Sequence, residues 1–149
     1  MTEARYAVAG VVPVAFLAVA VGHHPIVALP LLGGVFLPDV DALSERTHRS
    51  WACHTFLLPA VAYVAGDRLG LFTRVPELTT AIHFVTLGVA VHLALDFGYP
   101  RRRTHDGTSW PVRPAVPASH WGLLWLGAAW AFQWFLYLVP AFFPWVAGV

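Results

Sequence analysis

Apolar residues fill four long stretches of the chain, and short polar segments separate them. The first stretch, residues 6–37, contains no Asp, Glu, Lys or Arg, and its length exceeds the roughly 20 residues that one membrane-spanning helix needs. Pro25 lacks an amide proton and disfavours helix just before it. We therefore expect a helix near residues 6–22 and a second near residues 26–37. The second is short for a full span, so it is tilted, reaches only the membrane interior, or joins the first in one long kinked helix.

Three further apolar stretches follow the first. Residues 51–66 are marginal in length for a span, and residues 78–99 are the best-formed spanning segment. Residues 119–139 carry Trp at both ends, which is typical of a helix that crosses both membrane interfaces. Two prolines in the tail, residues 140–149, indicate that it lies at the interface. The pattern predicts an all-α fold, a single polytopic bundle with four or five transmembrane or membrane-embedded helices.

Composition supports a protein of the membrane. Hydrophobic residues make up 58% of the chain and charged residues 11%, whereas a soluble domain is about 25% charged. The formal net charge of +1 gives no indication of a nucleic-acid partner, so the expected partner is the lipid bilayer. Cys53 is the single cysteine, which excludes an internal disulfide and any multi-cysteine metal site. The first ten residues lack the pattern of a cleaved signal peptide, so we expect none.

The arginines predict the orientation in the membrane. Loops 38–50 and 100–118 are separated by two predicted crossings, so they share one side. Together they hold six arginines, whereas the connection 67–77 on the opposite side holds two. Because cytoplasmic loops are enriched in basic residues, we expect the two shared loops in the cytoplasm.

Two pairs of polar residues lie at this predicted face. His92 and Asp96 are four residues apart in a predicted helix, so they share a face and can bind one metal ion. A charged residue at a bilayer centre costs roughly 2.5 to 3.5 kcal/mol, so Asp96 needs a partner, and a hydrogen bond to His92 is the alternative. Asp39 and Asp41 can approach one centre through a turn, or Asp39 can cap the next helix.

His48 and His54 add two further nitrogen donors. They are six residues apart, which places them well over 90° apart on a regular helix. Either the helix begins between them, near Ser50, or one of them supports the ligands without binding the metal itself.

These residues together indicate an oxygen- and nitrogen-ligated site for one or two divalent ions, with zinc or manganese expected and magnesium as the alternative. A metal ion there would activate water, with Asp41, His48 or Asp96 as the general base. Substrate phosphate could pair with arginine, or the arginine run could anchor a helix end. The predicted metal ligands are Asp39, Asp41, His48, His54, His92 and Asp96, and the candidate substrate-binding residues are Arg49, Arg101, Arg102 and Arg103.

Four short strings in this region occur in a fixed order. They are LPDVD at residues 37–41, HRSWACHTF at residues 48–56, HLALD at residues 92–96 and GTSWP at residues 107–111. This order and spacing resemble the YdjM-like family of inner-membrane metal-dependent hydrolases over about half of the chain. The resemblance implies that the six residues named as ligands are the metal and catalytic residues, and that the protein lies in the inner membrane of a prokaryote.

The chain departs from the family pattern at several positions. One more residue separates His48 from His54 than is usual, and Thr55 stands where the family has Ser. Tyr6 and Ala42 stand where the family often has His, which leaves open one metal ion instead of two, or none. The expected function is hydrolysis of a phosphoester or acyl bond of a lipid. A small proton-coupled transporter and a non-catalytic membrane scaffold are the alternatives, and clustering at one face favours the hydrolase.

Overall fold

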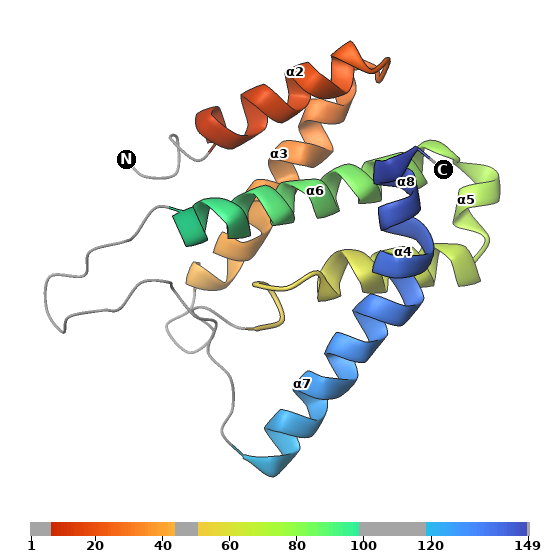
Figure 1. Cartoon of the computed structure of the whole chain (residues 1–149). Coiled ribbons are helices and arrows are strands. Elements are labelled where there is room, and N and C mark those ends of the chain that lie inside the picture. Colours follow the sequence, from red (N-terminus) through yellow and green to blue (C-terminus); the bar gives the residue numbers. More distant parts are fainter. Residues whose placement is uncertain (1–6, 44–50, 99–118, 149) are drawn as a thin grey trace, which may run out of the picture.

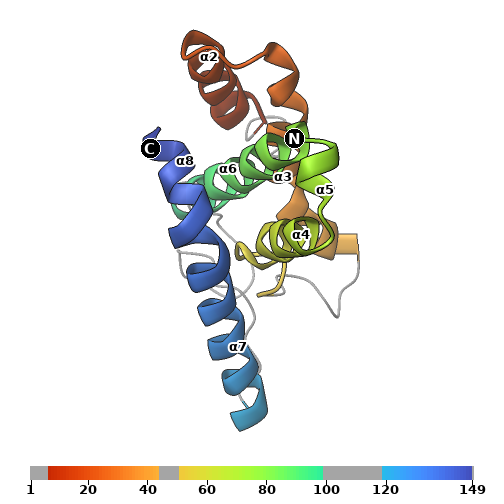
Figure 2. The same cartoon turned by 90° about the vertical axis from the view of Figure 1, so that its right-hand side faces the viewer.

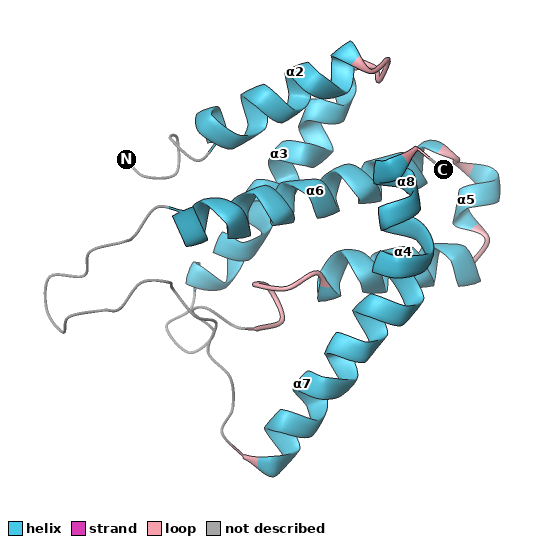
Figure 3. Cartoon of the chain, in the orientation of Figure 1, coloured by secondary structure: helices cyan, strands magenta, loops and turns pink. Residues whose placement is uncertain are grey.

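The computed structural model describes residues 7–43, 51–98 and 119–148, and this part of the chain is helical without a strand (Figures 1 and 3). The all-α prediction is therefore confirmed for these residues. In chain order the elements are the π-helix Ala7–Val11, α2 (Val12–Ala20), the 3₁₀-helix Pro25–Val27, α3 (Ala28–Phe36), the 3₁₀-helix Leu37–Leu43, α4 (Leu57–Arg68), α5 (Leu71–Arg74), α6 (Glu77–Gly98), α7 (His120–Gln133), the π-helix Trp134–Phe142 and α8 (Phe143–Ala147).

The first apolar stretch is broken where Pro25 predicts it. Gly22 follows α2 with φ +98°, a left-handed conformation that glycine adopts without steric cost. Nδ1 of His24 then accepts a hydrogen bond from the Ile26 amide at 3.2 Å, and Pro25 opens the next helical turn. Two separate helices result, so the single kinked helix is excluded.

Helices α3 and α6 pack more extensively than any other pair of described elements, and Figure 1 shows them crossing. Two glycines permit this close approach. A Cβ on Gly34 would lie 2.1 Å from the carbonyl oxygen of Val85, and a Cβ on Gly88 would lie 2.2 Å from the carbonyl oxygen of Leu31. Small residues of this kind let helix backbones meet inside membranes. The crossing fixes α3 against the face of α6 that carries His92.

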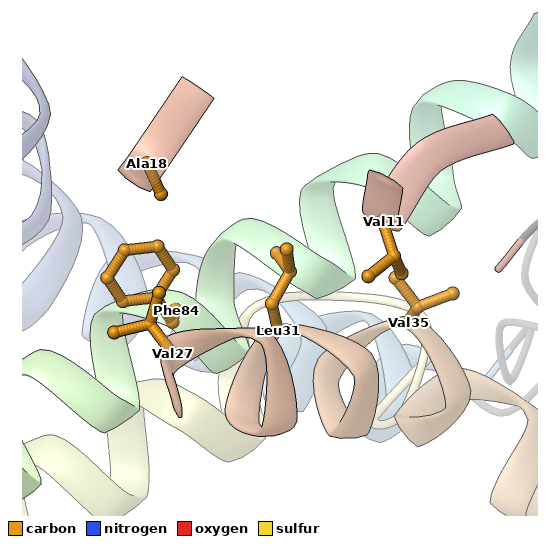
Figure 4. Packing of buried hydrophobic residues seen from close by; sticks show 6 residues of the cluster. All are labelled: Val11, Ala18, Val27, Leu31, Val35 and Phe84. Carbon is orange, nitrogen blue, oxygen red and sulfur yellow. The ribbon is translucent and has the colours of Figure 1, made fainter. Parts of the chain in front are cut away.

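Two apolar clusters complete the interior. The first joins α2 and its preceding π-helix to α3 and α6; Figure 4 shows its members, Val11, Ala18, Val27, Leu31, Val35 and Phe84. The second joins α4 to the last helix through Ala60, Tyr137, Leu138 and Phe142. In Figures 1 and 2, α7 passes α4 and leads to α8 near the amino-terminal half of α6.

Two helices of the described chain are long and apolar enough to cross a membrane. They span Glu77–Asp96, with 20 residues, and His120–Ala147, with 28 residues. The earlier apolar helices, Ala9–Ala20 and Pro25–Val40, are shorter than a full span. Four or five spans are therefore not shown, and two is the number that helix length supports.

Helix α4 begins later than the sequence predicts. Residues 51–56 form turns and bends, and the regular helix starts at Leu57 instead of near residue 51. Pro59 lies in the first turn, where its missing amide proton costs no helical hydrogen bond. The hydroxyl of Thr55 accepts a hydrogen bond from the Leu57 amide at 3.3 Å, which satisfies one of the first free donors.

The last helix continues past the predicted end at residue 139. Its helical course passes through Pro140 and ends at Ala147. The Trp134–Phe142 segment has the wider π-helical form, which accommodates the hydrogen bond that proline cannot donate. The helix starts where the Ser119 hydroxyl accepts a hydrogen bond from the Gly122 amide at 3.0 Å.

Candidate metal centre

His92 is the centre of the candidate site and is almost fully buried, with 1% of its surface exposed. Its Nδ1 lies 2.8 Å from the carbonyl oxygen of Val35, across the crossing of α3 and α6. A carbonyl oxygen only accepts, so Nδ1 carries the proton and donates this bond. In the neutral imidazole, Nε2 therefore carries the lone pair that can bind a metal ion, and the hydrogen bond to Val35 fixes the orientation of the ring.

Asp96 lies one helical turn after His92 and is also buried. Its Oδ2 is 3.3 Å from Nε2 of His92. An ionised carboxylate and the unprotonated nitrogen are both hydrogen-bond acceptors, so this approach requires a positive centre between them. A proton on Nε2, a proton on the carboxyl group or a metal ion satisfies the requirement.

His54 approaches the same pair from the segment that precedes α4. Its ring meets that of His92 edge-to-face, with the ring centroids 6.0 Å apart. One ligand atom from each of His54, His92 and Asp96 can be chosen so that all three lie within 4.8 Å of one another. The tertiary fold thus brings together donors that are separated by about forty residues of sequence.

Asp39 lies beside the same histidine, but at its other nitrogen. Its Oδ2 is 3.9 Å from Nδ1 of His92, and 30% of the side chain is exposed. Nδ1 already donates to Val35, so Asp39 adds negative charge to that edge of the ring. The structure therefore places Asp39 near the group formed by His54, His92 and Asp96 without including it in that group.

The structure does not describe the side chains of the other predicted site residues. Asp41 belongs by its backbone to the 3₁₀-helix Leu37–Leu43, but its side chain is not described. The structure likewise gives no placement for His48, Arg49, Arg101, Arg102 and Arg103. Their assigned roles stay predictions.

The three gathered side chains have the chemistry of a divalent-metal site. Imidazole nitrogen and carboxylate oxygen both bind zinc and manganese, and this group of three side chains contains no sulfur. Catalytic zinc sites commonly use three protein ligands and keep a fourth position for water or substrate. A ligating histidine usually donates its other ring proton to a carbonyl or carboxylate, as His92 does to Val35. The residues present therefore fit such an ion.

Sequence reasoning missed a second polar cluster on the opposite face of α6. The Thr86 hydroxyl donates to the carbonyl oxygen of Ile82 at 2.9 Å, so the Tyr137 hydroxyl must donate to Thr86 and accept from Nδ1 of His83. His83 and His92 are nine residues apart, which places them on opposite faces of a regular helix, and they contact different partners, Tyr137 and Val35. The partner Tyr137 lies 54 residues away, and no local spacing in the sequence indicates it.

Comparison with known proteins gives no relative. No family model matches the chain, and neither the curated proteins nor the solved structures contain a match.

Proposed function

We propose that this protein is a membrane-embedded, metal-dependent hydrolase that acts at one face of the bilayer. The observation that carries the proposal is the convergence of His54, His92 and Asp96. A group of three N and O donors, with one histidine held by a carbonyl hydrogen bond, resembles a catalytic metal site that keeps an open position. The resemblance of the motif strings to a hydrolase family points to the same chemistry.

The exposed surface of the last helix supports the membrane setting. Trp121 is 74% exposed, Trp125 66% and Phe135 74%. Contiguous large apolar side chains are costly in water and mark a surface that contacts lipid or another protein. Together with the two helices of spanning length, this surface supports integration into the bilayer. We propose the inner membrane of a prokaryote, with the site on the cytoplasmic side.

Each residue of the group has a distinct task in this proposal. His54 and His92 would hold the ion through neutral nitrogens, and Asp96 would add a negative oxygen. The ion, when bound, supplies a Lewis acid that polarises a phosphoryl or acyl oxygen and favours attack by water. Because Asp96 is directed at His92, the proton from the attacking water would pass to Asp41 or His48. Arg49 and Arg101–Arg103 would pair with a phosphate of the substrate.

Metal content tests the proposal directly. Protein purified in detergent, loaded with zinc or manganese and dialysed, should retain at least one ion per chain. His92→Ala should retain far less than one, whereas His83→Ala should retain as much as the wild type, because His83 lies on the opposite face of α6. Equal metal content in all three proteins, or no retained metal in the wild type, would contradict the proposal.

Catalysis is tested in the same three proteins. Wild type and His83→Ala should hydrolyse a phosphoester or acyl ester presented in lipid vesicles, and His92→Ala should lose most of this activity. Turnover should also disappear on chelation and return when the ion is restored. A thermal unfolding midpoint of His92→Ala close to that of the wild type would show that the variant is folded.

A proton-coupled transporter is the second candidate, and the cluster of His83, Thr86 and Tyr137 favours it. His83 lies nine residues from His92, which corresponds to about 13 Å along the helix axis. Buried titratable groups at two depths of a spanning helix are typical of proton pathways. This candidate predicts pH-dependent flux in liposomes that His83→Ala abolishes, whereas the hydrolase does not.

A further inference from the structure

A groove lies between α4 and α7, next to the segment that carries His54. Its volume is about 280 Å³. Every side chain that lines it is apolar: Trp51, Leu57, Val61, Trp125, Ala128, Ala129 and Phe132. None of these side chains carries a charge, so the groove suits a hydrocarbon.

Two residues of the groove wall flank His54 in the chain. Trp51 and Leu57 each lie three residues from His54, one before it and one after it. A molecule that fills the groove therefore has one end near the segment that supplies a proposed ligand. Three residues span at most roughly 11 Å, so this part of the groove wall lies within that reach of the His54 backbone, and His54 belongs to the group in which His92 and Asp96 meet.

The outer side of the groove opens to the exposed apolar surface of the bundle. Trp125 is 66% exposed and Val61 is 47% exposed, although both line the groove. In a bilayer this surface faces acyl chains, so a lipid chain can reach the groove without crossing water.

The size of the groove favours an acyl chain over a packed helix as its occupant. Its volume of about 280 Å³ lies just below the roughly 300 to 1,000 Å³ typical of small-molecule sites. A packed helix is about 10 to 12 Å wide with its side chains and needs a broad face, whereas an acyl chain is a single file of methylenes. Ala128 and Ala129 contribute only methyl groups to the wall, which also suits a chain without side branches.

We propose that the groove between α4 and α7 holds one acyl chain of a membrane lipid and presents its headgroup to His54, His92 and Asp96. This inference rests on the proposed function, because the metal centre would act on the headgroup. It deepens that function by making the substrate a lipid. The scissile bond is then an ester or phosphoester near the headgroup. Water adds to the acyl or phosphoryl centre, the bond to the leaving oxygen breaks, and that oxygen takes up a proton.

Two substitutions on one helix test the groove. Ala128 is exposed and lines the groove, so Ala128→Phe should fill it without disturbing the core. Gly127→Phe is the matched control, because a Cβ at Gly127 meets nothing within 4 Å and the residue does not line the groove. Both variants add the same side chain to adjacent positions of α7.

The probe is phosphatidylglycerol with one photoreactive acyl chain, in vesicles with wild type, each variant or His92→Ala. Wild type, Gly127→Phe and His92→Ala should crosslink within residues 51–61 or 125–132, and Ala128→Phe should lose at least about tenfold of that signal. Three results would overturn the proposal. The two Phe variants could crosslink equally, free glycerol phosphate could compete as strongly as lipid, or Ala128→Phe could only convert a dimer to a monomer.

Failure of the groove and failure of the metal centre give different results. If the groove proposal alone is wrong, Ala128→Phe still binds metal and still crosslinks to the lipid as the wild type does. If the metal proposal alone is wrong, wild type retains no ion, yet the Ala128→Phe loss of crosslinking remains and supports the groove. A variant that unfolds is recognised by its thermal midpoint, and Ala128→Leu then replaces it with the same expected direction.

Discussion

At the scale of single residues, the protonation of one imidazole determines what the candidate site can do. The four-residue spacing of His92 and Asp96 predicted that they share a helix face. The 3.3 Å between Nε2 of His92 and Oδ2 of Asp96 confirms this prediction. The hydrogen bond from His92 to Val35 could not be predicted, because its partners are 57 residues apart and the acceptor is a backbone oxygen. That bond makes Nε2 the ring nitrogen that can bind a metal ion.

Asp96→Asn separates metal binding from structure at this position. The amide group can donate a hydrogen bond to Nε2 of His92, so the pair no longer needs a positive centre between them. We expect the affinity for zinc to fall at least about tenfold, while the thermal midpoint measured in a chelator stays the same or rises. Competition with a zinc-binding dye and thermal unfolding measure the two quantities. An unchanged zinc affinity would show that Asp96 is not a ligand.

At the scale of helices, hydropathy and proline positions predicted the elements better than their ends. The predicted helix at residues 78–99 corresponds to α6, Glu77–Gly98, because its apolar run is long and lacks a proline. The end of the last helix was predicted wrongly, because a π-helical segment accommodates Pro140. The crossing of α3 and α6 was also missed. Its signal is the Gly33–Gly34 pair in an apolar helix, but only the three-dimensional arrangement shows which glycine faces a neighbour.

The two adjacent glycines of α3 should respond to alanine with opposite signs. Gly33→Ala meets nothing within 4 Å, so it should stabilise the helix by roughly 0.5 to 1 kcal/mol. Gly34→Ala would place a methyl group 2.1 Å from the Val85 carbonyl oxygen, so overpacking should destabilise the protein by about 1 to 3 kcal/mol. Thermal or denaturant unfolding in detergent compares them. Because α3 also holds the Val35 carbonyl, Gly34→Ala should weaken zinc binding, and an effect equal to that of Gly33→Ala would contradict the described crossing.

At the scale of the whole molecule, the sequence predicted the helical class but not the number of spans. The apolar helix Ala9–Ala20 has 12 residues, which is about 18 Å at 1.5 Å per residue, against a hydrocarbon core of about 30 Å. Hydropathy does not reveal that such a segment stops short, because the apolar run continues through the turn at Gly22. Packing of α2 and α3 against α6 determines where these short helices lie.

The orientation in the membrane can be tested with single cysteines in a Cys53→Ala background. Thr73 lies in α5, the short helix that precedes α6, and Ser119 immediately precedes α7 (Figure 1). Since the arginine-rich loops are expected in the cytoplasm, a membrane-impermeant maleimide should label Thr73→Cys in intact cells and Ser119→Cys only after permeabilisation. The reverse pattern would place the candidate site on the outer face, and labelling of both would exclude the proposed crossings.

The most direct test of the central claim is the coordination shell of zinc in the purified, zinc-loaded protein, measured by X-ray absorption. The account predicts two imidazole nitrogens and at least one carboxylate oxygen at about 2.0 to 2.2 Å, without sulfur. In His92→Ala one imidazole should disappear from the shell. A shell of oxygen atoms alone, or a sulfur at about 2.3 Å from Cys53, would contradict the assignment of His54, His92 and Asp96 as the metal centre.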